Sequence, residues 1–150
     1  MELPKILWLK NQMDPSLFSN CQFFDLPDYL TYRATDNPAR SACSLTCKCG
    51  FLPERGASSG SPSREPAKQN TGNVDDEHPK DGGWSPNLLR KIGLSECLEN
   101  GYKQLGGAAG RKDKNVLTAG MPVGKGLSIK AAEELGLEGG TPVGSAVIDA

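Results

Sequence analysis

A long polar segment divides this chain and limits what can fold around it. From Gly56 to Gly83 the residues are mostly Gly, Ser, Pro, Asn, Asp, Glu and Lys, and Val74 is the only large aliphatic residue. Such a segment cannot bury enough apolar surface to offset its ordering entropy, which is about 1 to 2 kcal/mol per residue for the backbone alone. We therefore predict a disordered insertion over residues 56–83, between two packed segments, 1–55 and 84–150.

The start of the chain has the apolar spacing of a helix. Leu3, Ile6, Leu7 and Leu9 surround Trp8 and suit a short helix with one apolar face. A tryptophan combines a large apolar ring with one polar N–H group, and such residues concentrate in cores and interfaces. We therefore predict that Trp8, like the later Trp84, is an anchor of a core or an interface.

A second helix is predicted to begin after Asp25. Asp25 suits the N-cap, and Pro27 suits the first turn because its missing N–H group would have been unpaired there. Leu26, Tyr29 and Leu30 stand at positions i, i+3 and i+4. This spacing predicts that these three side chains form the buried face of the helix.

The second packed segment contains two helices with clear ends. Ser85 is followed by Pro86 and an apolar stretch that stops at Gly93, and Ser128 begins another helical stretch that stops at Gly136. A serine before and a glycine after an apolar stretch are typical helix boundaries.

Two short strands are also predicted, one over Ser41–Thr46 and one in the apolar, β-prone run from Gly140 to Asp149. The order of helix, short loop and strand near the carboxyl end indicates an α/β fold.

Charge and hydropathy exclude several classes of partner. The net charge is -1 and the pI is about 5.8, which favours neither nucleic acid nor an anionic membrane surface. No stretch approaches the roughly 18 to 20 apolar residues that cross a bilayer, and the first five residues lack the pattern of a secretory signal. The five cysteines are odd in number and suit reduced thiols. We therefore expect a cytosolic protein.

The cysteines also raise the alternative of a zinc-binding module. Cys43, Cys47 and Cys49 form one loose cluster, and Cys97 would have to supply a fourth ligand. Structural zinc sites usually use two separated pairs of cysteines, and this chain has no matching second pair. We favour buried, apolar roles for these cysteines and expect no metal site.

Several motifs in order along the chain resemble the FGGY carbohydrate kinases, particularly their ribulokinase-like branch. They are FDLPDYL at 24–30, CSLTCK at 43–48, GL at 93–94 after a tryptophan-led helix, PVGKGLS at 122–128, and AAEELGL, GTPVG and IDA within 131–150.

The resemblance implies part of the first of two actin-like, ribonuclease-H-type domains that close on a sugar and ATP. This chain would contribute the sugar side. Asp149 falls where the family has the base that takes a proton from the attacking sugar hydroxyl, and Lys48 falls on a lysine that lies near the sugar in ribulokinases. The implied acceptor is a pentulose or a related sugar or polyol, and the full-length enzyme would use ATP and Mg²⁺.

The departures from the family pattern also lead to expectations. The acidic, Gly-Thr-containing phosphate loop that opens the family has no counterpart before Pro4, and Cys49-Gly50 replaces an aromatic residue that many relatives have after the lysine. We therefore expect a chain truncated at its catalytic Asp149, binding no cofactor and inactive alone. The alternative is a non-catalytic interaction module, such as a truncated isoform or remnant, that pairs exposed strand edges with another chain or with itself.

Overall fold

The computed structural model describes residues 2–52, 82–107 and 115–148. Most of the insertion predicted over 56–83 lies outside the described residues, as does Asp149. The described helices are α1 (Leu3–Gln12), α2 (Pro15–Asn20), α3 (Leu26–Thr35), α4 (Ala42–Cys49), α5 (Pro86–Lys91), α6 (Glu99–Tyr102) and α7 (Ile129–Leu135), with short 3-10 turns η1 (Ser95–Leu98) and η2 (Lys103–Leu105).

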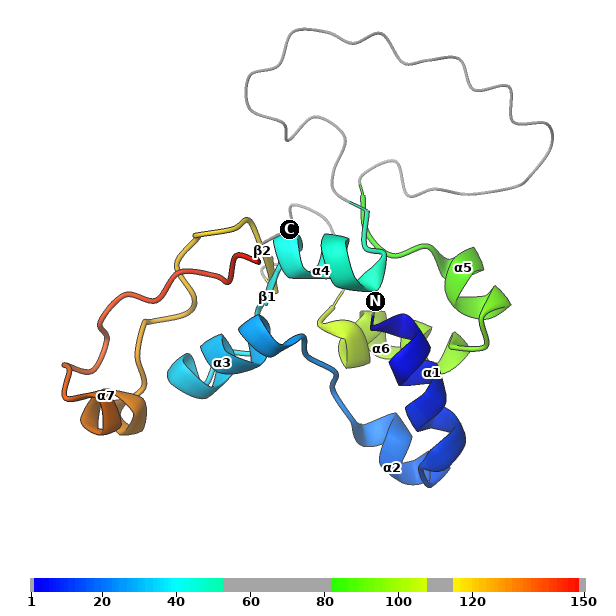
Figure 1. Cartoon of the computed structure of the whole chain (residues 1–150), viewed down its shortest axis with the longest axis horizontal. Coiled ribbons are helices and arrows are strands. Elements are labelled where there is room, and N and C mark those ends of the chain that lie inside the picture. The colour runs from blue at the N-terminus through cyan, green and yellow to red at the C-terminus, as the bar shows by residue number, and fades with distance from the viewer. Residues whose placement is uncertain (1, 53–81, 108–114, 149–150) are drawn as a thin grey trace, which may run out of the picture.

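The described strands, β1 (Arg40–Ser41) and β2 (Val116–Leu117), form one parallel pair. Arg40 lies opposite Val116, and Ser41 lies opposite Leu117. In Figure 1 this pair lies beside the start of α4, and the segment that leads from β2 to α7 runs away from it. Mixed helices with a small parallel pair are compatible with the predicted α/β class.

The main core gathers apolar side chains from both packed segments. Its buried members are Leu3, Ile6, Phe18, Leu45, Cys49, Phe51, Trp84, Leu89, Leu94, Cys97 and Leu105. A smaller cluster joins α7 to α3 through Leu127, Ala131 and Ala132, with Ala34 and Val143 packed against it. The predicted core role of Trp84 is confirmed, because this side chain is 4% exposed.

The two helices with clear sequence boundaries are confirmed. Ser85 Oγ accepts a hydrogen bond from the main-chain N–H of Leu88 at 3.2 Å, and α5 follows. Ser128 Oγ accepts one from the N–H of Ala131 at 3.2 Å, and α7 ends at Gly136 in the left-handed conformation, with φ of +67°. These capping interactions join residues within one helical turn, which explains why the local sequence predicts them.

The strand predicted over Ser41–Thr46 is wrong. Only Arg40–Ser41 is a strand, and α4 begins immediately afterwards at Ala42. Ser41 is the N-cap of α4, because its Oγ accepts a hydrogen bond from the N–H of Cys43 at 3.2 Å. Gly50 ends the helix in the left-handed conformation, with φ of +72°. A short apolar run is compatible with either a strand or a helix, and here the two capping residues favour the helix.

The strand predicted after Gly140 is also wrong for the described residues. This segment forms one isolated antiparallel bridge, in which Gly144 pairs with Pro122. Hydrogen bonds from the N–H of Val123 to Val143 O (2.8 Å) and from the N–H of Ser145 to Met121 O (2.7 Å) hold it in place. Proline has no N–H group to donate to a ladder, so Pro122 and Pro142 prevent regular pairing.

The prediction that Leu26, Tyr29 and Leu30 form the buried face of α3 is also wrong. Leu26, Tyr29 and Leu30 are 66%, 41% and 58% exposed, whereas Asp28 on the same helix is 1% exposed. Burying a carboxylate costs hydration, and the hydrogen bond from Ser41 to Asp28 offsets that cost only in part. The predicted stripe of α3 therefore does not face the core, and Asp28 on the same helix contacts β1 instead.

Candidate functional site

Lys48 lies in the last turn of α4 and is half-buried. Its main-chain carbonyl accepts a hydrogen bond from the N–H of Glu2 at 2.7 Å, which ties this end of α4 to the start of α1. The other end of α4 begins directly after β1. Lys48 is thus on a short helix that is held at both ends, by β1 and by the amino-terminal segment.

The segment that leads to Asp149 is held at the end of β2. Ser145 is buried, and its Oγ donates a hydrogen bond to the carbonyl of Thr118 at 2.6 Å, one residue after β2 ends. The N–H of Gly120 donates to the carbonyl of Ser145 at 3.1 Å. In Figure 1 the red end of the described chain accordingly lies beside β2.

Parallel pairing of the strands brings the start of α4 and the segment that leads to Asp149 to one edge, whereas Lys48 lies at the other end of α4. Because β1 and β2 run in the same direction, their carboxyl ends lie together, and this is the edge where α4 begins and where Ser145 is bound. Ligands of open α/β folds bind outside the carboxyl ends of the strands. Asp149 itself lies outside the described residues.

The buried carboxylate of Asp28 contacts the end of β1 at this edge of the strand pair. Its Oδ1 accepts a hydrogen bond from the main-chain N–H of Ser41 at 2.9 Å, while Oδ2 is buried and has no hydrogen-bond partner among the described residues. Burial raises the pKa of Asp28 to about 6, although the Ser41 N–H and the charge of Arg40 act in the opposite direction. Asp28 therefore fixes α3 against the residue at which β1 ends and α4 is capped.

Arg40 is the cationic neighbour of Asp28 and is 1% exposed. Its Nη2 donates to the carbonyl of Phe23 at 3.1 Å and its Nη1 to the carbonyl of Pro38, and the guanidinium carbon lies 3.2 Å from the centre of the Phe24 ring. Burial lowers the pKa of Arg40 to about 10, and Asp28 opposes this shift. These contacts orient β1 from both sides.

Sequence reasoning missed the roles of Asp28 and Arg40. An acid in the first turn of a helix is usually explained by the helix dipole, which requires no distant partner. Its partner Ser41 lies 13 residues away. No periodic pattern predicts a contact of that kind, so only the folded chain reveals it.

The buried Asp28 predicts a pH dependence of stability. Because its pKa rises from the ordinary 3.8 to about 6, the folded protein retains a proton between about pH 4 and pH 6 that the unfolded chain has lost. The free energy of unfolding should therefore fall as pH rises through this window. Asp28→Asn keeps an acceptor for the Ser41 N–H and should remove this contribution. Urea unfolding of both proteins from pH 4 to pH 7 tests it, and identical pH slopes would contradict it.

Two of the five thiols, those of Cys49 and Cys97, are buried. Burial raises the pKa of Cys49 to about 12 and that of Cys97 to about 11, so both remain protonated. The predicted buried role is confirmed for these two, whereas Cys43 is half-buried and Cys47 is exposed. Within residues 2–52, 82–107 and 115–148, no group of three or more His, Cys, Asp or Glu side chains could hold a metal ion.

The helices among the described residues are too short and too polar to cross a lipid bilayer.

Comparison with known proteins finds relatives that are named as carbohydrate kinases. No family model matches it. D-ribulokinase YDR109C of Saccharomyces cerevisiae is 44% identical over 150 residues, which are 100% of this chain and 18% of that protein. FGGY carbohydrate kinase domain-containing proteins are 34% identical over 148 residues in Danio rerio and 32% identical over 151 residues in Homo sapiens, covering 98% and 100% of this chain and 21% of each relative.

These matches extend along the whole chain and confirm the resemblance that the motifs indicated. Along its whole length the chain is similar to FGGY carbohydrate kinase domain-containing proteins and to a D-ribulokinase. It spans about a fifth of the length of the relatives that it matches.

Proposed function

We propose that this chain supplies the sugar side of an ATP-dependent kinase that phosphorylates a hydroxyl of D-ribulose or a related pentulose or polyol. The observation that carries the proposal is 44% identity to a protein named D-ribulokinase along all 150 residues. The parallel pair and its helices would then be part of an actin-like, ribonuclease-H-type domain. We expect the enzyme to be cytosolic.

Two side chains carry the chemistry in this proposal. Phosphoryl transfer needs an acceptor hydroxyl that is held in line with the phosphate and loses its proton as it attacks. Asp149 takes that proton as general base, and Lys48 donates hydrogen bonds that orient the sugar. Ser145 is bound at the end of β2, and the helix that carries Lys48 in its last turn begins at the same edge, which supports placing the two residues on one side of the parallel pair.

In this proposal, ATP and Mg²⁺ bind to parts of the full-length enzyme outside these 150 residues. The described residues provide no cluster of carboxylates that fits a divalent cation, so no step is assigned to a metal bound by them. The relatives are about five times as long as the chain, which leaves ample polypeptide for the nucleotide site. We therefore expect the 150 residues alone to have no kinase activity.

A chimera tests the proposal. The 150 residues replace the matched segment of the yeast D-ribulokinase, and ATP-dependent phosphorylation of D-ribulose is measured beside the parent yeast protein and the isolated chain. We expect activity in the chimera and none in the isolated chain. A soluble chimera that unfolds cooperatively but has no activity would contradict the proposed role.

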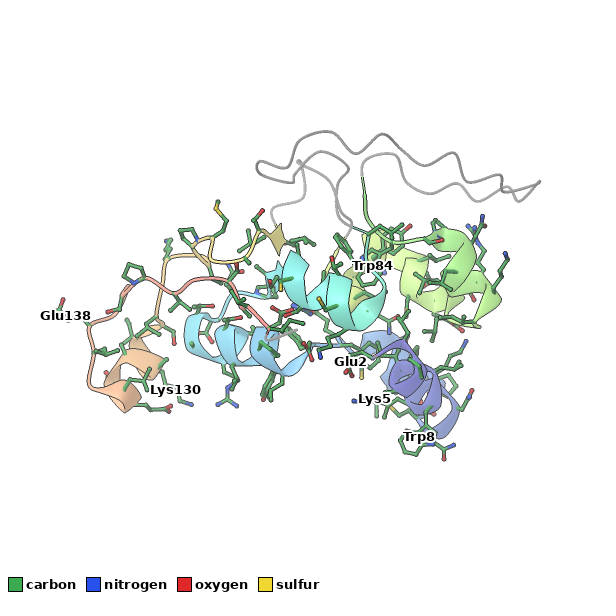
Figure 2. All side chains as sticks on the ribbon, turned by 45° about the horizontal axis from the view of Figure 1, so that its top comes forward. Glu2, Lys5, Trp8, Trp84, Lys130 and Glu138 are labelled. Carbon is green, nitrogen blue, oxygen red and sulfur yellow. The ribbon has the colours of Figure 1, made fainter. Side chains whose placement is uncertain are left out.

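Lys48→Met in this chimera should raise the KM for D-ribulose. Hydrogen bonds from a charged group contribute about 1.5 to 3 kcal/mol, which corresponds to roughly a 10- to 100-fold change in KM. The control is Lys130→Met, which removes an exposed lysine of α7, far from α4 in Figure 2. Equal KM values for the two variants would exclude Lys48 from the sugar site.

A further inference from the structure

Helix α4 begins with a capping arrangement that the helix does not complete by itself. Ser41 is the N-cap, and its Oγ accepts a hydrogen bond from the N–H of Cys43. In a capping box, the side chain three residues after the N-cap binds the N–H of the N-cap residue. That position is Ser44, whose Oγ is buried and has no hydrogen-bond partner among the described residues. The N–H of Ser41 donates to Asp28 Oδ1 instead, so α3 supplies the acceptor for the first turn of α4.

Lys48 lies at the margin of the same face of α4. Residues three and four apart share a face of a helix, and Ser41, Ser44 and Lys48 follow this spacing. Ser41 and Ser44 are both 0% exposed, Lys48 is half-buried, and Cys47 is exposed. The face that meets Asp28 at one end of the helix therefore carries the lysine of the proposed sugar site at its other end.

The short length of α4 couples its first turn to Lys48. The helix has 8 residues, so at about 1.5 Å per residue Lys48 is roughly 10 Å along the axis from Ser41. Without Asp28, the buried N–H of Ser41 would need another acceptor, and Ser44 Oγ is the group on the helix that a capping box would use. Closing that box changes the first turn, and the shift is transmitted to the last turn.

We propose that Asp28 is a positioning residue for the sugar site, because it fixes the first turn of α4 and thereby the place of Lys48. The other end of the helix is held by the hydrogen bond from the N–H of Glu2 to the carbonyl of Lys48. Asp28 provides the second restraint and makes no contact with the sugar in this proposal. The inference rests on the proposed role of Lys48.

Asp28→Leu in the yeast chimera tests the proposal. Leucine has nearly the shape of aspartate but offers no acceptor to the N–H of Ser41. The kcat/KM for D-ribulose should fall by up to roughly 100-fold, the factor that a misplacement of about 1 Å costs, and the KM for ATP should stay unchanged. Asp28→Asn keeps an acceptor and should restore most of the loss. Loss of the same size in Asp28→Asn would overturn the proposal.

A double-mutant cycle with Lys48→Met shows whether Asp28 acts through Lys48. Asp28→Leu should add little to the effect of Lys48→Met, because the group that it positions is already gone. Additive effects of the two substitutions would overturn the proposal. Ala132→Gly is the control for lost stability, since Ala132 is 2% exposed in the cluster that joins α7 to α3. It should lower stability without changing the KM for D-ribulose.

Acetylation of lysines in the isolated chain, read by mass spectrometry, gives a measurement that needs no kinase activity. Asp28→Leu should raise the acetylation rate of Lys48 relative to the exposed Lys130, and Asp28→Asn should not. An unchanged rate for Lys48 would overturn the proposal. A raised rate together with a normal KM in Lys48→Met would support the link between Asp28 and Lys48 and refute the proposed function of Lys48. If Asp28→Leu does not fold, Asp28→Ser replaces it, because the serine side chain is too short to take the place of the carboxylate.

Discussion

Asp149→Asn in the yeast chimera should reduce kcat for D-ribulose phosphorylation by about 100- to 10,000-fold, the factor that a positioned general base contributes. The amide cannot accept the proton of the sugar hydroxyl at the pH of the reaction, yet it has nearly the shape of the carboxylate. The KM for the sugar should therefore change much less than kcat. Initial rates at varied D-ribulose and saturating ATP separate the two constants.

Glu138→Gln provides the matched control for this substitution. Glu138 is an exposed acid in the loop that follows α7, and only its main-chain carbonyl is used, as an acceptor for Thr141. Replacing it removes the same charge at a position away from the end of β2. A kcat for Asp149→Asn close to that of Glu138→Gln would exclude Asp149 as the base.

Trp84→Ala should lower the free energy of unfolding of the chain by about 3 to 5 kcal/mol, as for other buried tryptophans. The Trp84 ring packs edge-on against Phe51 with 5.2 Å between ring centres, and it stacks on Tyr102 at 6.4 Å. Its Nε1 donates a hydrogen bond to the carbonyl of Gly107 at 2.9 Å. One side chain thus connects three separate parts of the core. Against a total stability of roughly 5 to 15 kcal/mol for a domain, this loss is large.

Urea unfolding followed by circular dichroism measures the effect, and two variants calibrate it. Trp84→Phe keeps an aromatic ring in the core and loses the hydrogen bond to Gly107, so it should lose less stability than Trp84→Ala. Trp8→Ala changes an exposed ring and should alter the stability of the isolated chain by less than about 0.5 kcal/mol. If Trp84→Ala were as stable as Trp8→Ala, the described core would be wrong.

The two tryptophans show that a local sequence pattern does not predict which aromatic ring becomes buried. Both were predicted to be anchors of a core or an interface, although Trp8 lies within α1 and Trp84 directly precedes the cap of α5. Trp84 is buried because Phe51, Tyr102 and Gly107 come together around it from other parts of the chain. Trp8 has no such neighbours among the described residues and remains on the surface.

The resemblance to FGGY carbohydrate kinases and the ends of two helices can be predicted from the sequence alone. The motifs at 24–30, 43–48, 122–128 and 131–150 are contiguous in the chain and can be compared directly with relatives. The helix caps at Ser85 and Ser128 use partners three residues away, so their chemistry is visible locally.

The side of α3 that is buried follows from the tertiary structure alone. The same holds for the edge of the β1–β2 pair, where α4, the helix of Lys48, begins beside the segment that precedes Asp149. Asp28 is buried against Ser41, Arg40 donates to Phe23, and Ser145 donates to Thr118, each across 13 to 27 residues. Burial of a polar group depends on whether a partner is present to compensate for lost hydration. Distant parts of the chain provide that partner, so the spacing of apolar residues along one helix does not predict it.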